Sequence, residues 1–129
     1  MKKILLLDDN LDIVQIVAEV LTYEGYQVQS VSTCTGFLSV IAGFEPDLIL
    51  LDYRLRDGNG GELCRQIKNH TQFSYIPVVL FTAYAQRDFG FENFGFDGFI
   101  AKPFDLDELI ETVQGLLYSD SHGFDLADH

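Results

Sequence analysis

The sequence is poor in basic residues. It holds 8 Lys and Arg against 20 Asp and Glu, which gives a formal net charge of −12. From Asp88 to His129, Lys102 is the single basic residue (histidines not counted), against ten acids. A nucleic-acid-binding surface needs a basic patch, so we expect no nucleic-acid partner. Composition leaves two explanations of the acidity open: solubility, or attraction of a basic protein partner.

Long apolar stretches and cysteines are scarce as well. No apolar run approaches the ~20 residues that a helix needs to cross a bilayer, so we expect no membrane contact. The opening residues, MKKILLLDDN, contain lysines and a short apolar run, but Asp8 and Asp9 end that run. No cleavage site of small residues follows, as a signal peptide would require. With only Cys34 and Cys64, free thiols in a reducing compartment are favoured, and we expect a cytoplasmic protein.

Strand-like and helix-like patterns alternate along the chain. Short apolar runs typical of buried strands, and one alternating segment, mark five predicted strands. They cover residues 3–7, 26–31, 47–51, 76–81 and 98–101. Helical spacing marks residues 12–24, 35–44, 63–67 and 105–117. Strands alternating with helices predict a doubly wound α/β domain, with a five-stranded parallel sheet covered on both faces.

One domain is expected over residues 1–118, since 129 residues suit a single core. The last helix is the clearest, because Asp105 can cap it and Glu108 completes a capping box. Residues 119–129 are polar, and we expect a disordered tail there. No linker or output domain is expected.

Chemically active residues fall where predicted strands end. Asp8 and Asp9 follow the first strand, Asp52 follows the strand at 47–51, and Thr82 and Lys102 follow the last two. In an open α/β sheet, ligands bind at this edge. Converging carboxylates repel one another, by about 1 kcal/mol per pair in water and more when partly buried. Mg²⁺ prefers such oxygen ligands and would remove that cost.

A simpler explanation is that Asp8 and Asp9 only help to cap the first helix. The matching positions of Asp52, Thr82 and Lys102 argue against it. A carboxylate can act as a nucleophile and form an acyl phosphate, and phosphoryl transfer needs a metal and positioned donors. Lys102 offers an ammonium group and Thr82 a hydroxyl, although each could also be an ordinary residue at a strand end.

The motifs together resemble a known family. Asp8–Asp9, LILLDYRLRDGNGG, VVLFTAY and FIAKPF, in this order and spacing, are similar to the receiver domain of bacterial response regulators. The resemblance covers roughly residues 2–117. It implies a flavodoxin-like sheet with strand order 2-1-3-4-5.

The resemblance also implies a metal site and a phosphoacceptor. Asp52 would accept a phosphoryl group from a phosphohistidine on a sensor histidine kinase or a phosphotransfer protein. Asp9 and Asp52 would bind Mg²⁺ with the backbone carbonyl of Arg54, and Asp8 would act through water. The chain would be no enzyme beyond catalysing its own phosphorylation and dephosphorylation.

Further residues would complete a switch. Lys102 would pair with the phosphoryl oxygens, and Thr82 would move to bond them. Phe99 would be the aromatic residue whose rotamer follows Thr82. The Lys102–Pro103 peptide bond is commonly cis in this family. Modification would add charge and bias a two-state element.

Some positions depart from the family pattern. Arg56 stands where a proline is usual, four residues after Asp52, so we expect a less rigid loop; Gly60 is retained. The resemblance implies that Arg54 and Tyr84 occupy the two variable positions that, in this family, tune the lifetime of the phosphoryl group. Both are bulky, and we expect them to shield the acyl phosphate from water.

The segment DFGFENFGFDGF, at residues 88–99, is the most unusual. Thr82 and Lys102 are twenty positions apart, about two fewer than in typical receivers, which predicts a short or distorted fourth helix that stops near Gly95. Phe89 and Phe91 cannot both face inward on a helix. We therefore expect them in a partner surface that contacts a downstream protein with basic and apolar groups.

Two other functions compete. The chain could be a phosphorylation-independent protein-interaction module that keeps the receiver fold. It could also be a phosphatase-like hydrolase with Asp52 as nucleophile, but that class needs a second acid two residues later, where this chain has Arg54.

Overall fold

The computed structural model describes residues 1–83 and 94–128, with side chains described as far as residue 118. Tyr84, Phe89, Phe91 and the predicted fourth helix lie outside the described residues. No helix among those described is both long and apolar enough to cross a membrane.

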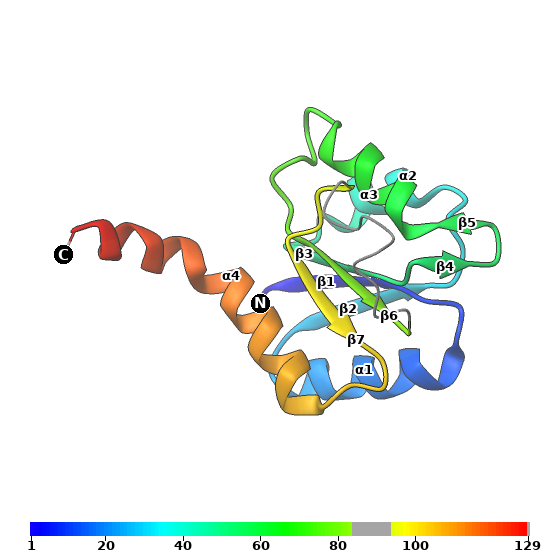
Figure 1. Ribbon diagram of the computed structural model, residues 1–129, viewed down its shortest axis with the longest axis horizontal. Helices are drawn as coiled ribbons and strands as arrows, with labels where there is room; N and C mark the ends of the chain where they lie inside the picture. Colours follow the sequence, from blue (N-terminus) through cyan, green and yellow to red (C-terminus); the bar gives the residue numbers. More distant parts are fainter. Residues whose placement is uncertain (84–93, 129) are drawn as a thin grey trace.

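Five parallel strands form the central sheet (Figure 1). They are β1 (Lys3–Leu7), β2 (Gln27–Val31), β3 (Leu48–Leu51), β6 (Val78–Thr82) and β7 (Gly98–Ala101). Their order is β2-β1-β3-β6-β7. This order is the expected 2-1-3-4-5, because β4 and β5 pair only with each other in a separate small sheet.

Helices cover both faces of the sheet (Figure 1). They are α1 (Leu11–Tyr23), α2 (Phe37–Phe44), α3 (Gly60–Lys68) and α4 (Leu106–Asp128). In α1 the Asn10 side chain accepts hydrogen bonds from the amides of Asp12 and Ile13 and so caps the helix. Gly25, with φ of 96°, follows its end, as a helix stop requires.

Alternate side chains of the central strands β1 and β3 enter two hydrophobic cores. Ile4 and Leu6 of β1 pack in the core under α1 and α4, whereas Leu5 and Leu7 pack in the core under α2 and α3. All four are fully buried. Burying one such side chain stabilises the fold by about 1.5–3 kcal/mol, so the continuous apolar run requires a central strand with both faces covered.

The loop after β3 contains a hairpin that was not predicted. Its strands, β4 (Arg54–Leu55) and β5 (Gly58–Asn59), pair antiparallel. The side chain of Asp57 holds the hairpin, because it accepts hydrogen bonds from Cys34 and Thr35 in the loop before α2. The hairpin is thus anchored to the loop before α2, and the lower rigidity expected without a proline at position 56 stays a prediction.

The last helix is longer than predicted. α4 continues to Asp128, whereas residues 119–129 were expected to form a disordered tail. No proline follows Pro103 to end the helix. The division into a domain at residues 1–118 and a tail stays a prediction.

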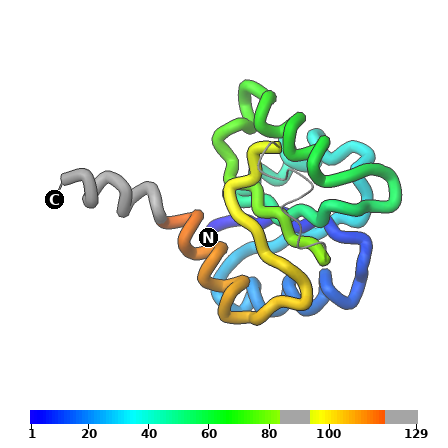
Figure 2. Tube along the Cα trace, in the orientation of Figure 1, coloured from blue at the N-terminus to red at the C-terminus, as the bar shows by residue number. Residues whose placement is uncertain are grey.

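The chain from Phe94 to β7 passes beside the end of α3 (Figure 2). Lys68 of α3 forms an ion pair of 2.7 Å with Asp97, and Asp97 also accepts the amide hydrogen of Val78. Gly95 has φ of 89°, which suits the helix stop expected there. Phe94 and Phe96 are partly buried against the core under α2 and α3.

Candidate functional site

The residues singled out at the strand ends come together at the carboxyl edge of the sheet. The backbone places them: the Asp52 amide donates to the Leu7 carbonyl at 2.9 Å, and the Lys102 amide donates to the Thr82 carbonyl at 2.8 Å. These bonds align the ends of β1 with β3 and of β6 with β7. The strand-end pattern therefore predicted the right neighbours.

Three carboxylates form the centre of the site. Asp8, Asp9 and Asp52 each offer one oxygen, and these oxygens lie within 4.8 Å of one another. Asp8 is fully buried, Asp52 is 8% exposed and Asp9 is half-buried. Three negative charges this close, in a partly buried place, are unfavourable without a cation.

Lys102 supplies one cation. Its Nζ lies 2.6 Å from Asp8 Oδ2 and 3.5 Å from Asp52 Oδ2. The ammonium also lies 4.9 Å from the centre of the Phe81 ring. The Lys102–Pro103 peptide bond is cis, as the resemblance implied.

The pKa of Asp52 is raised to about 6, first by burial and then by the neighbouring Asp8 carboxylate. Lys102, a hydrogen bond from Thr82 and a 2.9 Å hydrogen bond from the Tyr53 amide oppose the rise. Desolvation disfavours the charged form, whereas a cation and hydrogen-bond donors favour it. Asp52 is therefore largely ionised at neutral pH, yet its charge is poorly compensated.

Thr82 and Phe99 occupy different environments. Thr82 ends β6 and is fully buried beside Asp52. Phe99 lies in β7, opposite Leu80 in the register, and is 41% exposed. It is therefore not a core side chain in this structure.

The donor set fits Mg²⁺. Mg²⁺ takes hard oxygen ligands, usually one or two carboxylates with several waters, and three carboxylate oxygens converge here. The single ammonium of Lys102 does not balance them. Arg54, whose backbone carbonyl was expected to join the metal ligands, lies in β4, directly after the segment that carries Asp52.

Two residues near the site were not predicted to matter. Arg56 Nε lies 4.0 Å from Asp9 Oδ2. Asp57, the next residue, holds the hairpin to the loop before α2. The signal in the sequence was the missing proline at position 56, which was interpreted only as a loss of rigidity.

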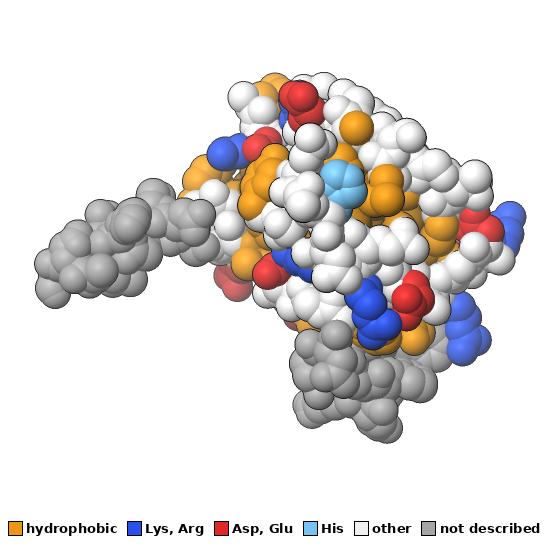
Figure 3. All heavy atoms as spheres, turned by 90° about the horizontal axis from the view of Figure 1, so that it is seen from above, with side chains coloured by type: hydrophobic (Ala, Val, Ile, Leu, Met, Phe, Trp, Pro, Cys, Tyr) orange, Lys and Arg blue, Asp and Glu red, His pale blue; other side chains and the backbone are white. Residues whose placement is uncertain are grey.

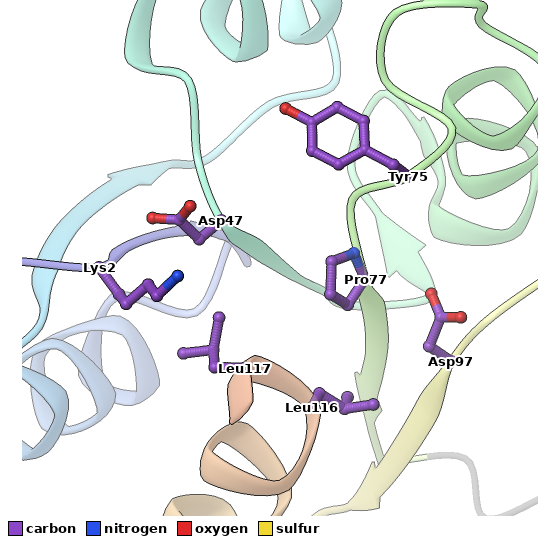
Figure 4. A pocket seen from close by; sticks show the side chains of 7 residues that line it. All are labelled: Lys2, Asp47, Tyr75, Pro77, Asp97, Leu116 and Leu117. Carbon is purple, nitrogen blue, oxygen red and sulfur yellow. The ribbon is translucent and has the colours of Figure 1, made fainter. Parts of the chain in front are cut away.

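A separate hollow lies at the opposite, amino edge of the sheet (Figure 4). It has a volume of about 360 Å³ and is lined by Lys2, Asp47, Tyr75, Pro77, Asp97, Leu116 and Leu117. Its carboxylates already hold the fold together: Asp47 accepts the Lys3 amide hydrogen at 2.8 Å, and Asp97 pairs with Lys68. The hollow therefore lacks the chemistry found around Asp52.

Comparisons with known proteins point to one family. A family model described as the response regulator receiver domain matches residues 4–114. The chain is 35% identical over 119 residues to the transcriptional regulatory protein GltR of Pseudomonas aeruginosa, covering 90% of this chain and 49% of GltR. It is 33% identical to sporulation initiation phosphotransferase F of Bacillus subtilis, covering 90% of this chain and 94% of that protein.

Solved structures agree. Response regulator protein TrrA of Thermotoga maritima, in complex with Mg²⁺-BeF, has a TM-score of 0.82 at 29% identity, covering 91% of this chain and 100% of that chain. The chain spans about half the length of the first curated relatives that it matches.

Proposed function

The chain belongs to the response regulator receiver domain family, and from that premise we propose that it is the phosphoacceptor of a two-component phosphorelay. Asp52 would take a phosphoryl group from a phosphohistidine on a sensor histidine kinase or a phosphotransfer protein. One observation carries this proposal: Asp52 lies among two further carboxylates and the Lys102 ammonium at the ligand-binding edge of the sheet.

The chemistry follows from these side chains. An Asp52 carboxylate oxygen attacks the phosphorus atom, the bond between phosphorus and the donor imidazole nitrogen breaks, and the nitrogen leaves with its electron pair. Mg²⁺, when bound by Asp9 and Asp52 with the Arg54 carbonyl and with Asp8 through water, would neutralise charge on the phosphoryl oxygens. Catalysis is limited to the phosphorylation and dephosphorylation of the chain itself.

Lys102 and Thr82 would receive the phosphoryl group. In the present structure the Lys102 ammonium pairs with both Asp8 and Asp52, so it is placed to pair with oxygens added to Asp52. The Thr82 hydroxyl bonds to Asp52 now and would bond to a phosphoryl oxygen afterwards. Phe99, exposed on the neighbouring strand, would report that change at the surface.

The output would be a protein contact in the cytoplasm. Acidic residues dominate the last third of the chain, so a downstream partner should offer basic and apolar surface. Phe89 and Phe91 remain the residues proposed for this contact. No nucleic-acid or membrane contact is proposed for these residues.

Phosphorylation can be tested directly. Incubation with Mg²⁺ and acetyl phosphate, or with a phosphohistidine donor, should add the mass of one phosphoryl group. The Asp52→Asn variant should show no increase, whereas Asp107→Asn, an exposed acid on α4, should behave as the original chain. If no modification forms under any of these conditions, the phosphorylation-independent interaction module becomes the better function.

The lifetime of the acyl phosphate tests a finer point. We propose that Arg54 and Tyr84 shield it from water. The double variant Arg54→Ala/Tyr84→Ala should lose the phosphoryl group faster than the original chain, measured by mass spectrometry over time. An unchanged or slower loss would contradict this role.

A further inference from the structure

We propose that Arg56 is a counter-ion at the rim of the metal site, where it weakens Mg²⁺ binding in the resting protein and strengthens binding of the phosphoryl group. This inference rests on the proposed function of Asp52. It concerns a residue that stands where a proline is usual, and a hairpin that was not expected from the sequence.

The backbone places Arg56 at the tip of a tight hairpin. Leu55 of β4 pairs with Gly58 of β5, so Arg56 and Asp57 form the two-residue turn between them. This turn lies four residues after Asp52. From the tip, Arg56 Nε reaches to 4.0 Å from Asp9 Oδ2 at the rim of the carboxylate cluster.

Asp57 fixes the position of that tip. Its carboxylate accepts hydrogen bonds from the Cys34 amide at 2.9 Å, from the Thr35 amide at 3.2 Å and from the Thr35 hydroxyl at 2.8 Å. These bonds lower the pKa of Asp57, the Cys34 amide contributing most. Gly58 packs beside the Cys34 side chain, since an added Cβ would lie 3.1 Å from its Sγ. The hairpin is thus tied to the loop before α2 as well as to β3.

The effect of the Arg56 charge changes sign between the two states of the site: it repels Mg²⁺ and attracts a phosphoryl group. Three carboxylates, those of Asp8, Asp9 and Asp52, lie beside two cations, Lys102 and Arg56. Mg²⁺ adds two positive charges to this nearly balanced group, so Arg56 opposes it. Phosphorylation replaces the Asp52 charge by a group with about two negative charges, so Arg56 then attracts.

Mg²⁺ titration tests the resting state. By calorimetry at low ionic strength, Arg56→Gln should bind Mg²⁺ about two- to fivefold more tightly, because an exposed pair is worth little and salt screens it. Arg65→Gln is the matched control: Arg65 lies on α3 and pairs with Glu62 at 3.0 Å. An Arg56→Gln affinity equal to that of the original chain or of the control would overturn the proposal.

Beryllium fluoride, which mimics a phosphoryl group, tests the phosphorylated state of the site. At saturating Mg²⁺, Arg56→Gln should bind it about two- to fivefold more weakly than the original chain. The two affinities must therefore shift in opposite directions. A shift of both in the same direction would show a structural effect of the substitution and would end the counter-ion proposal.

Variants of Asp57 test whether its hydrogen bonds position Arg56. Asp57→Ala should release the tip, raise amide hydrogen exchange at Cys34 and Thr35, and tighten Mg²⁺ binding as Arg56→Gln does. The double variant should gain no more than either single one, because both act through one group. Asp57→Asn keeps an acceptor oxygen, so its amide hydrogen exchange and its Mg²⁺ affinity should lie closer to those of the original chain. Faster exchange without a change in Mg²⁺ affinity would refute the coupling of Asp57 to Arg56.

The outcomes separate this inference from the proposed function. If the original chain binds Mg²⁺ and is phosphorylated on Asp52, but the Arg56 and Asp57 variants match it, only the inference fails. If the original chain neither binds Mg²⁺ nor accepts a phosphoryl group, the proposed function fails, and the role of Arg56 fails with it.

Discussion

The buried Asp52 carboxylate lowers the free energy of unfolding by an amount that depends on pH. Its pKa is about 6 in the folded protein against an ordinary value of 3.8. A raised carboxyl pKa stabilises the fold at low pH, and this stability is lost as the pH rises from about 4 through 6. Asp52→Asn removes the ionised group, so the variant should be more stable above pH 6 by about 2–3 kcal/mol.

Urea unfolding in EDTA, at pH 4 and at pH 7.5, measures this difference. The gain should be much smaller at pH 4, because Asp52 is then protonated in the folded protein and, with its ordinary pKa of 3.8, only about half ionised in the unfolded chain. An equal gain at both pH values would contradict the electrostatic cause and indicate a packing effect of the amide.

A second prediction about a single residue concerns Lys102. Lys102→Met leaves the fully buried Asp8 carboxylate without the ammonium 2.6 Å away. Removing one partner of a buried pair costs about 3–5 kcal/mol, so this variant should unfold at much lower urea concentration. Adding Asp8→Asn removes the unpaired buried carboxylate and should recover part of the lost free energy of unfolding. The effects of the two substitutions should therefore be strongly non-additive. Additive losses would show that the pair is not coupled.

The sequence predicted the residues of the site better than their environment. Asp8, Asp9, Asp52, Thr82 and Lys102 could be found because each directly follows or ends an apolar strand. The position of Arg56 could not, because it depends on the bonds that Asp57 makes to residues more than twenty positions earlier in the chain. Such a contact leaves no periodic pattern in the sequence.

At the scale of elements, Gly60 joins the hairpin to α3. A Cβ on Gly60 would lie 2.1 Å from the Asp52 backbone oxygen, and the Gly60 amide donates to the Tyr53 carbonyl at 2.7 Å. Backbone atoms cannot move aside as a side chain can. Gly60→Ala should therefore destabilise the protein by about 1–3 kcal/mol and weaken Mg²⁺ binding, because Asp52 must shift.

Gly43→Ala is the matched control for this prediction. Gly43 lies within α2, and no atom lies within 4 Å of its added Cβ. Alanine is favoured over glycine inside a helix by about 1 kcal/mol, so this variant should gain stability in the same thermal melts. If Gly60→Ala melts no lower than the original chain, the close approach to Asp52 is not a constraint.

Regular elements were predicted where an apolar pattern exists. Strands β1 and β3 lie within the apolar runs at 3–7 and 47–51, and β6 overlaps the run at 76–81 and ends one residue beyond it, at Thr82. The β4–β5 hairpin has strands of two residues, which are too short to show alternation. Asp57 anchors it to a distant loop, and local sequence does not reveal that contact.

At the scale of the whole molecule, strand order and charge distribution decide what the fold can present. The order β2-β1-β3-β6-β7 came from the family resemblance, since periodicity alone does not order strands. On the face over α2 and α3, basic side chains are scattered among acidic and polar ones (Figure 3). This pattern on the described residues favours a protein partner over nucleic acid, which remains a prediction.

The net charge of −12 makes two effects of added salt separable. NaCl screens self-repulsion, so the melting temperature should rise gradually in the original chain and in Asp52→Asn alike. Mg²⁺ at constant ionic strength acts only through its site. At ten times its Kd it should stabilise the original chain by about 1.4 kcal/mol, or a few degrees. Asp52→Asn should gain much less, because a metal ligand is missing. An equal gain in both chains would mean that Mg²⁺ merely screens the acidic surface and does not bind among Asp8, Asp9 and Asp52.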